Sequence, residues 1–133
     1  MTKVRRKIEI RSEQGQALTE FALALPILAL LLFAVIQFGI AFNNYVTLTD
    51  ATRAGARKAI TSKHESNPAS LCEASVRASA QDLDQGDLDA SCESTWTDGA
   101  NVTVTATYPY EISLLGMVVK SGRLSSTTQE RME

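Results

Sequence analysis

The carboxyl group of Glu20 is the first candidate for chemistry in this 133-residue chain, because it stands at the entrance of an apolar run. Every residue from 21 to 36 is apolar apart from the imino acid Pro26. An unpaired carboxylate in a lipid-embedded helix costs on the order of 2.5–3.5 kcal/mol at the bilayer centre and less near its surface. Such a residue is a functional hypothesis, and the question that it raises is the identity of its partner.

A partner for Glu20 would have to be made, because no basic residue lies one helical turn away in the uncut chain. A cut after Gly15 would supply a cation, since Gln16 would become the new N-terminus with its α-amino group four residues before Glu20. The same amine on a neighbouring, axially shifted subunit would serve equally well. The alternative is that Glu20 belongs to an ordinary signal anchor and reaches to water at the interface.

Four further positions in this segment are candidates for helix packing, namely Phe21, Pro26, Gln37 and Gly39. Pro26 removes one backbone N–H and frees a carbonyl in the preceding turn, which predicts a kink that is either tolerated or functional. Amide and small residues such as Gln37 and Gly39 are favoured where helices meet in lipid. They could equally mark the approaching interface.

The two cysteines of the chain, Cys72 and Cys92, both lie in its second half. In an oxidising compartment such a pair predicts a disulfide. Closing a loop of ~20 residues stabilises a fold by about 3 kcal/mol in the chain-entropy model. Two cysteines are too few for a zinc site, and they do not form a Cys-x-x-Cys motif.

Two weaker candidates are the acidic stretch at residues 82–89 and His64. Four aspartates stand around Gly86 in this stretch and resemble a calcium loop, but the spacing of an EF-hand is not met. A solvated acidic turn is the better interpretation. His64 has no nucleophile or carboxylate constellation near it in the sequence. We therefore expect no enzymatic activity, no metal and no cofactor.

The charges divide the chain into three parts. Residues 1–15 carry five bases and two acids, whereas residues 61–133 carry five bases and eleven acids, so the net charge of −2 is an average. A basic tail before an apolar run favours a cytoplasmic N-terminus, with the acidic head on the other side of the membrane. Nucleic-acid binding needs a clustered basic face and is not expected. A chain of this length has room for one small domain and an anchor.

The apolar run must itself be a helix if it is to position Glu20. Residues 16–42 at 1.5 Å per residue span ~40 Å, which is enough to cross a bilayer. No small-residue cleavage site closes the run, so we expect it to be retained rather than removed as a signal peptide. Mostly small residues then recur every three or four positions to about residue 61, which predicts a helix that continues outside the membrane and packs closely. They are Ala41, Tyr45, Leu48, Ala51 or Thr52, Gly55 and Ala59.

The head is predicted to contain a second helix and a small sheet. Asn67 is a plausible cap and Pro68 a first helical residue, for a helix from about Ala69 to residues 85–86. Residues 101–108 alternate strictly between apolar and threonine positions, as in a strand. A turn at 97–100 precedes this strand, and residues 94–96 could be the other arm of the hairpin. Residues 112–119 could be loop, helix or strand, and residues 124–129 could close the sheet.

The predicted fold class is therefore α+β, with a long N-terminal transmembrane helix that continues into a small head with a second helix and a short antiparallel sheet. The expected domains are a basic cytoplasmic leader (1–15), a transmembrane helix (16–42), its extramembrane continuation (43–61) and a periplasmic or extracellular head (62–133).

The residues around the predicted cut resemble a known pattern. Gly15 followed by Gln16-Ala-Leu-Thr-Glu20-Phe21, behind a basic leader and before a long apolar helix, resembles the prepilin-peptidase site of the type IV pilin superfamily. More narrowly, residues 17–26 followed by Gln37-Phe-Gly39 are similar to the TadE-like family of minor pilins, or pseudopilins, of the tight-adherence (Flp) pilus. The resemblance covers residues 12–60, with a much weaker echo at residues 131–133.

This resemblance implies a structural protein of the bacterial inner membrane, with its N-terminus in the cytoplasm and its head in the periplasm or in an extracellular pilus. It implies removal of the leader after Gly15 by a prepilin peptidase, and a role for Glu20 in setting the register of subunits. Its partners would be lipid, other pilin subunits and the inner-membrane assembly platform. The head of about 70 residues favours a minor subunit over a major one. The alternatives are a signal-anchored periplasmic binding or sensing domain with an uncleaved N-terminus, and an anchored hydrolase, for which no catalytic set is present in the sequence.

Overall fold

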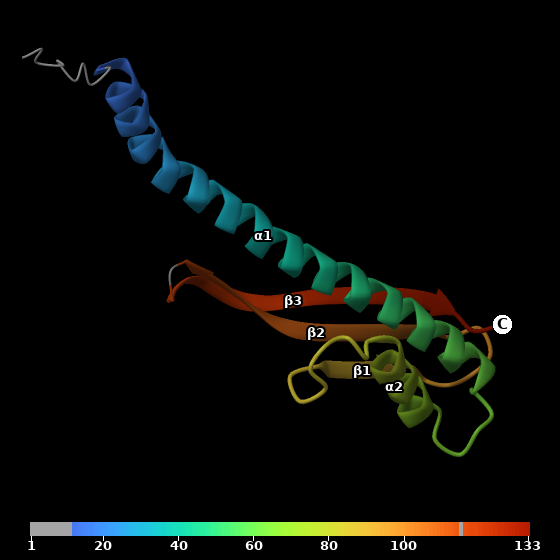
Figure 1. Ribbon diagram of the computed structural model, residues 1–133. Helices are drawn as coiled ribbons and strands as arrows, with labels where there is room; N and C mark the ends of the chain where they lie inside the picture. Colours follow the sequence, from blue (N-terminus) through green and yellow to red (C-terminus); the bar gives the residue numbers. More distant parts are fainter. Residues whose placement is uncertain (1–11, 115) are drawn as a thin grey trace, which may run out of the picture. The chain divides into compact units, whose positions relative to one another are not determined.

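The computed structural model describes residues 12–114 and 116–133. Its elements, in chain order, are α1 (Ser12–Thr61), α2 (Pro68–Ser79), β1 (Asp89–Glu93), β2 (Asn101–Leu114) and β3 (Met117–Arg131) (Figure 1). The fold class is α+β, as predicted. Most of the predicted leader lies outside the described residues. Residues 12–15, the end of that leader, are helical and form the start of α1.

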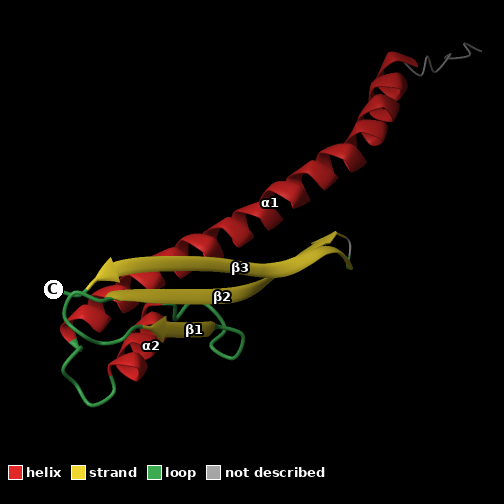
Figure 2. Ribbon diagram, turned by 180° about the vertical axis from the view of Figure 1, so that it is seen from behind, coloured by secondary structure: helices red, strands yellow, loops and turns green. Residues whose placement is uncertain are grey.

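The described chain divides between Val35 and Ile36 into two compact units, both of which contain part of α1. The first unit is helix alone. The second unit holds the rest of α1 together with α2 and a three-stranded antiparallel sheet in the order β1-β2-β3. In Figure 2 the hairpin of β2 and β3 extends well beyond the short strand β1.

Strand β2 lies between β1 and β3 in the sheet. Its first residues alternate between buried and open positions, as the sequence predicts. Val102, Val104 and Ala106 are fully buried, and the threonines between them lie on the other face. Val104 is paired with Cys92 of β1 and with Thr128 of β3, so these three residues share the buried face. The opposite face is open and polar.

The second half of α1 covers the buried face of the sheet with a stripe of mostly small residues. The fully buried members of this stripe are Leu48, Ala51, Thr52, Ala56 and Ala59. Thr52 Oγ1 lies 2.8 Å from the hydroxyl of Thr128 on β3, so that helix and sheet also meet through paired hydroxyl groups. The predicted stripe is confirmed from Leu48 onward. Tyr45, which was expected in it, is 43% exposed.

Gly55 lets α1 approach its neighbours closely. A Cβ atom added there would lie 2.4 Å from Val76 Cγ2 on α2 and 3.2 Å from Val104 Cγ1 on β2. Both neighbours are β-branched, so neither can rotate away at little cost. The glycine is thus required by the packing of three elements.

Replacing Gly55 by alanine is expected to lower the free energy of unfolding of the head by about 1 kcal/mol, measured by urea denaturation. Overpacking costs roughly 1–3 kcal/mol, which outweighs a gain of about 1 kcal/mol in helix propensity. Gly39→Ala is the matched control, because an added Cβ there would meet no described atom within 4 Å. It should be neutral or stabilising. A Gly55→Ala protein as stable as wild type would contradict the close packing.

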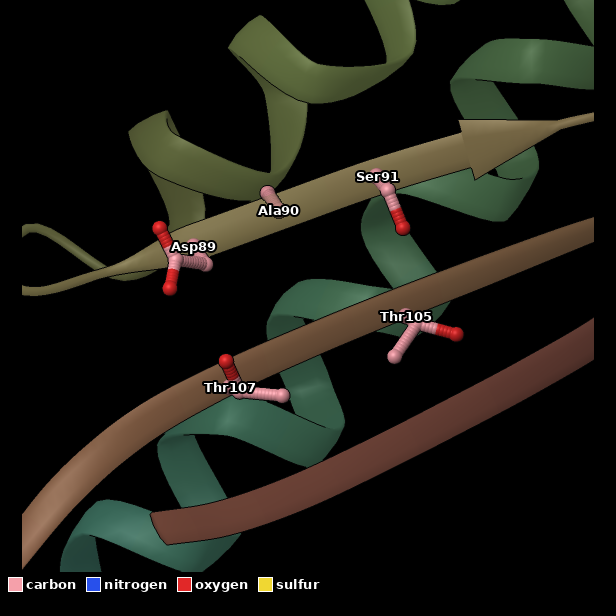
Figure 3. A pocket seen from close by; sticks show the side chains of 5 residues that line it. All are labelled: Asp89, Ala90, Ser91, Thr105 and Thr107. Carbon is pink, nitrogen blue, oxygen red and sulfur yellow. The ribbon is translucent and has the colours of Figure 1, made fainter.

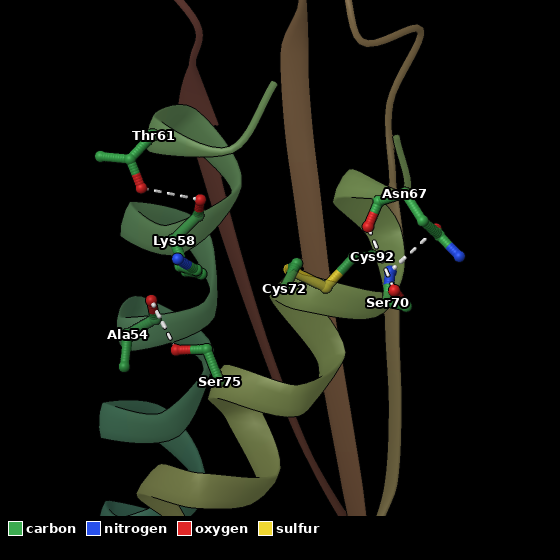
Figure 4. Close-up of a disulfide and its surroundings, with 8 residues drawn as sticks. All are labelled: Ala54, Lys58, Thr61, Asn67, Ser70, Cys72, Ser75 and Cys92. Carbon is green, nitrogen blue, oxygen red and sulfur yellow. Dashed lines mark hydrogen bonds between the residues drawn. A yellow bond between two sulfur atoms is a disulfide. The ribbon is translucent and has the colours of Figure 1, made fainter. Parts of the chain in front are cut away.

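Helix α2 begins as predicted and ends earlier. Asn67 is its N-cap, with the side-chain carbonyl accepting a hydrogen bond from the backbone N–H of Ser70, and Pro68 follows it (Figure 4). The helix stops at Ser79, so the expected end at residues 85–86 was wrong. Leu83 nevertheless remains buried, in the turn after the helix.

The hairpin partner of β2 also differs from the prediction. The turn at residues 97–100 is present, with the N–H of Ala100 donating to the carbonyl of Thr97. Residues 94–96 do not form the other arm, because Trp96 has a φ of 55° in the left-handed region. The pairing strand is β1 instead. Of residues 112–119, for which the sequence allows loop, helix or strand, residues 112–114 and 117–119 are strand, and Gly116 lies in a turn with a φ of 82°.

The predicted disulfide between Cys72 and Cys92 is present and ties α2 to β1 (Figure 4). The two Cα atoms lie 6.3 Å apart and both residues are buried. The bond closes a loop of 20 residues that includes the acidic turn. It thereby holds the shortest strand against the core.

Replacing both cysteines by serine is expected to lower the free energy of unfolding of the head by about 3 kcal/mol. The main cause is the larger conformational freedom of the unfolded chain. Denaturation of the oxidised protein and of the Cys72→Ser/Cys92→Ser variant measures the difference. Reductant should destabilise wild type only. Equal unfolding midpoints for the two proteins would contradict a stabilising role.

An ion pair joins the end of α1 to the turn before β2. Lys63 Nζ lies 2.6 Å from Asp98 Oδ1 and also donates to the main-chain carbonyl of Glu133. The hydrogen bond from Lys63, followed by its positive charge, lowers the pKa of Asp98 below its ordinary value. A lowered folded-state pKa stabilises the fold above the unfolded pKa of about 3.9, and this contribution is lost as the pH falls through the folded value.

Asp98→Asn is therefore expected to be slightly less stable than wild type at neutral pH and equally stable in strong acid. The effect is small because Asp98 is exposed and water screens the pair. Denaturation of both proteins across this pH range checks the prediction, and high salt should shrink the difference. A difference that persists unchanged into acid would rule out the charge of Asp98 as its cause.

Candidate processing and packing site

The residues of the predicted cut lie together in one turn of α1. Gln16 Nε2 donates a hydrogen bond to Glu20 Oε1 over 3.1 Å, and the hydroxyl of Thr19 donates to the carbonyl of Gly15 over 2.9 Å. All four residues are exposed. The carboxylate thus has a neutral amide partner in the uncut chain, at the same residue whose amine a cut would free. The sequence alone points to the α-amine of Gln16 as the partner of Glu20 and does not indicate its side-chain amide.

The carbonyl of Gly15 belongs to the peptide bond at which the sequence predicts the cut. It lies inside the helix and is held by Thr19. Threonine hydroxyls bond the carbonyl four residues back at two other places in α1, at Tyr45 and Arg57. This contact is therefore an ordinary helical one. A peptidase would have to open the first turns of the helix to reach the bond.

The apolar side chains that follow Glu20 are exposed on all sides of the single chain. Phe21 is 58% exposed and Leu23 72%, and none of the 18-residue apolar window is buried. Helix α1 is long and apolar enough to cross a membrane. A helix that is apolar all round is normally buried, either in lipid or among other helices.

Of the four predicted packing residues, Phe21 and Pro26 lie in the first unit and Gln37 and Gly39 in the second. Pro26 stands inside α1, which continues through it. Gly39 faces open space. Gln37 is half-buried, and its Nε2 donates to the carbonyl of Ser113 on β2 over 3.3 Å. The amide therefore has a partner within its own chain, at a sequence separation that no local pattern could have predicted.

The aspartates of the acidic stretch and His64 lie at the surface of the head. Asp84 Oδ1 accepts a hydrogen bond from the N–H of Gly86 over 2.8 Å, which makes part of the acidic stretch a local turn. Residues 12–114 and 116–133 hold no group of three or more His, Cys, Asp or Glu side chains that could bind a metal ion. His64 is exposed.

The open face of the sheet contains a shallow hollow, which Figure 3 shows between β1 and β2. Its polar lining residues are Asp89, Ser91, Thr105 and Thr107. Asp89 is occupied by an ion pair with Arg123, whose guanidinium also donates to Thr107 over 3.1 Å. The hollow is thus a solvated, internally paired surface.

Comparison with known proteins finds a family match for most of α1 and none for the head. Residues 15–57 match the family model for TadE-like proteins, which confirms the resemblance drawn from the residues around the predicted cut. The match begins at Gly15 and ends within the second half of α1. No curated protein and no solved structure matches the chain significantly.

Proposed function

From the TadE-like segment at residues 15–57, we propose that the chain is a minor pilin, or pseudopilin, of the tight-adherence pilus. It is anchored in the bacterial inner membrane by α1, with the N-terminus in the cytoplasm and the head in the periplasm. A prepilin peptidase removes the leader after Gly15. The mature subunit then joins the assembly platform and other pilin subunits through its helix, and it has no enzymatic activity of its own.

The observation that carries this proposal is the uncovered apolar surface that begins directly after Glu20. An anchor that stays in lipid needs only to be apolar, whereas a carboxylate at its entrance adds a cost. A subunit that moves from lipid into a filament exchanges one apolar surrounding for another. In the filament the carboxylate would have a function, because it can pair with the amine of a neighbouring subunit at one axial offset between the helices and not at others.

The hydrogen bond between Gln16 and Glu20 supports this role for the carboxylate. In the uncut chain the partner is an uncharged amide, 3.1 Å away. After the cut the same residue carries an α-ammonium group, and two opposite charges attract each other more strongly than a carboxylate and a neutral amide, most of all away from water. Processing would thus turn a weak local contact into a charged pair that can be made within one subunit or between neighbours. Such pairs specify register better than they add stability.

The experiment that tests the proposal is co-expression with a prepilin peptidase, followed by mass spectrometry of the membrane-bound protein. The expected N-terminus is Gln16, and the full-length chain should remain when the peptidase is absent or inactive. The alternative, a signal-anchored binding or sensing domain, predicts an intact chain under both conditions. An intact chain that works in the membrane beside an active peptidase would overturn the proposal.

A further inference from the structure

The far end of the β2–β3 hairpin is an apolar surface that the head does not use. We define the hairpin tip as residues 112–114 and 116–119. Strand β1 pairs with β2 only from Thr103 to Thr107, so the tip has no third strand beside it (Figures 1 and 2). Residues 112–119 carry no charge in the sequence, and Glu111 and Lys120 flank them. The tip is thus an uncharged end of a hairpin that reaches away from the core.

The β3 side of the tip is exposed, whereas Ile112, Ser113 and Leu114 on β2 are half-buried. Met117, Val118 and Val119 are 69%, 57% and 62% exposed. Adjacent residues of a strand point to opposite faces, so β3 is uncovered on both faces of the hairpin at this end. Three consecutive large apolar residues in this state indicate a surface that something else covers.

The position of the tip along α1 identifies what covers it. Ser126, in the middle of the hairpin, contacts the hydroxyl of Thr49, and Ser113, in the tip, accepts the hydrogen bond from Gln37. The hairpin therefore runs along the second half of α1, with its tip at Gln37. Gln37 directly follows the last residue of the uninterrupted apolar run. Residues 21–36 alone span ~24 Å as a helix, so Gln37 comes near the outer edge of a hydrocarbon layer ~30 Å thick.

We propose that the hairpin tip inserts into the outer surface of the lipid bilayer beside α1. The inference rests on the membrane anchoring that is part of the proposed function. Gln37 and Ser113 then lie at the edge of the hydrocarbon layer, with Met117 and Val118 among the upper acyl chains. Lys120 stands on the head side of these residues, where its ammonium group can reach lipid phosphates.

The insertion is shallow, because the edges of the hairpin limit its depth. Beyond β1 the outer edge of β2 has no neighbouring strand among the described residues, and unpaired backbone groups are costly in hydrocarbon. Lipid is favoured over a second copy of the chain because Ser113 of the tip is bonded to Gln37, the residue that directly follows the apolar run. A second bilayer contact would restrict rotation of the head about the axis of α1.

The test uses the full chain in vesicles of phosphatidylethanolamine and phosphatidylglycerol, with one environment-sensitive fluorophore at Val118→Cys. The two native cysteines are joined to each other and do not react. Leu28→Cys on α1 is the control for anchoring, and Thr127→Cys on the open face of the sheet is the control for water. The expected result is a blue-shifted emission at residues 28 and 118, lost to a nitroxide-labelled lipid, and neither effect at residue 127.

Each other outcome overturns the inference in a distinguishable way. Quenching at residue 28 with a water-like signal at residue 118 would leave the anchor in place and refute lipid contact of the tip. A probe at residue 118 that is shielded from both lipid and aqueous quenchers, and becomes exposed on dilution of the protein, would assign the tip to a second copy. A water-like signal at residue 28 would refute the anchoring itself and the inference with it.

Discussion

Replacing Gly15 by leucine is expected to leave the chain at full length beside an active prepilin peptidase. The bond to be cut lies inside α1, so the first turns must open and the backbone must approach the catalytic groups closely. Glycine favours both steps, since it weakens a helix by about 1 kcal/mol and has no side chain. Leucine reverses both. Mass spectrometry of membrane-bound protein should show only the uncut mass.

The structure offers a matched control for this variant. Neither Gly15 nor Gly39 has a described atom within 4 Å of an added Cβ, so α1 accommodates a larger side chain at both positions. Gly39→Leu should therefore be cut like wild type, and loss of cutting in Gly15→Leu cannot be attributed to misfolding. Normal maturation of Gly15→Leu would show that the residue does not specify the cut.

Replacing Glu20 by glutamine is expected to leave the cut intact and to reduce incorporation into pili at least about tenfold. The variant keeps the size of the side chain and one carbonyl acceptor, and it removes the charge. A charged pair worth about 1.4 kcal/mol corresponds to a tenfold change in an equilibrium. The measurement is the ratio of the subunit in sheared pili to the subunit in membranes, for protein whose N-terminus has been verified as Gln16.

Asp50→Asn is the control for Glu20→Gln, because it removes an acid from the same helix outside the apolar segment. Asp50 makes one exposed ion pair with Arg53, at 3.5 Å, which contributes little. It should assemble normally. Equal incorporation of Glu20→Gln and wild type would refute a register role for the carboxylate, while the maturation experiment would stand by itself.

The sequence predicted the features that depend on neighbouring residues. The apolar run and the small-residue stripe define α1 locally, and Asn67 and Pro68 define the start of α2 by their own chemistry. The alternation at residues 101–108 predicted β2 for the same reason. The disulfide could be predicted because only two cysteines exist to form it.

The features that were missed depend on contacts between distant residues. Strand β1 has five residues and alternates as β2 does, with Ala90 and Cys92 on the inner face, but the stretch is short and both of these residues are small. A pattern of this length carries little signal in the sequence, and the pairing with β2 and the disulfide hold the strand in place. Met132 is fully buried and exchanges two backbone hydrogen bonds with the turn at Gly99 and Ala100. The contact of Gln37 with Ser113 has no signal in the sequence either.

The packing of Leu48, Ala51 and Ala59 into the head has a consequence for how the head could be shed from a cell surface. A protease that severs α1 at Asn43 or Asn44 would separate the head from its helical anchor and leave the head with every buried residue of its core. Severing the chain at Thr61 would instead leave the buried face of the sheet without its largest cover. The folded fragment therefore starts within the helix, and release of an intact head is possible only over the short exposed stretch before Leu48.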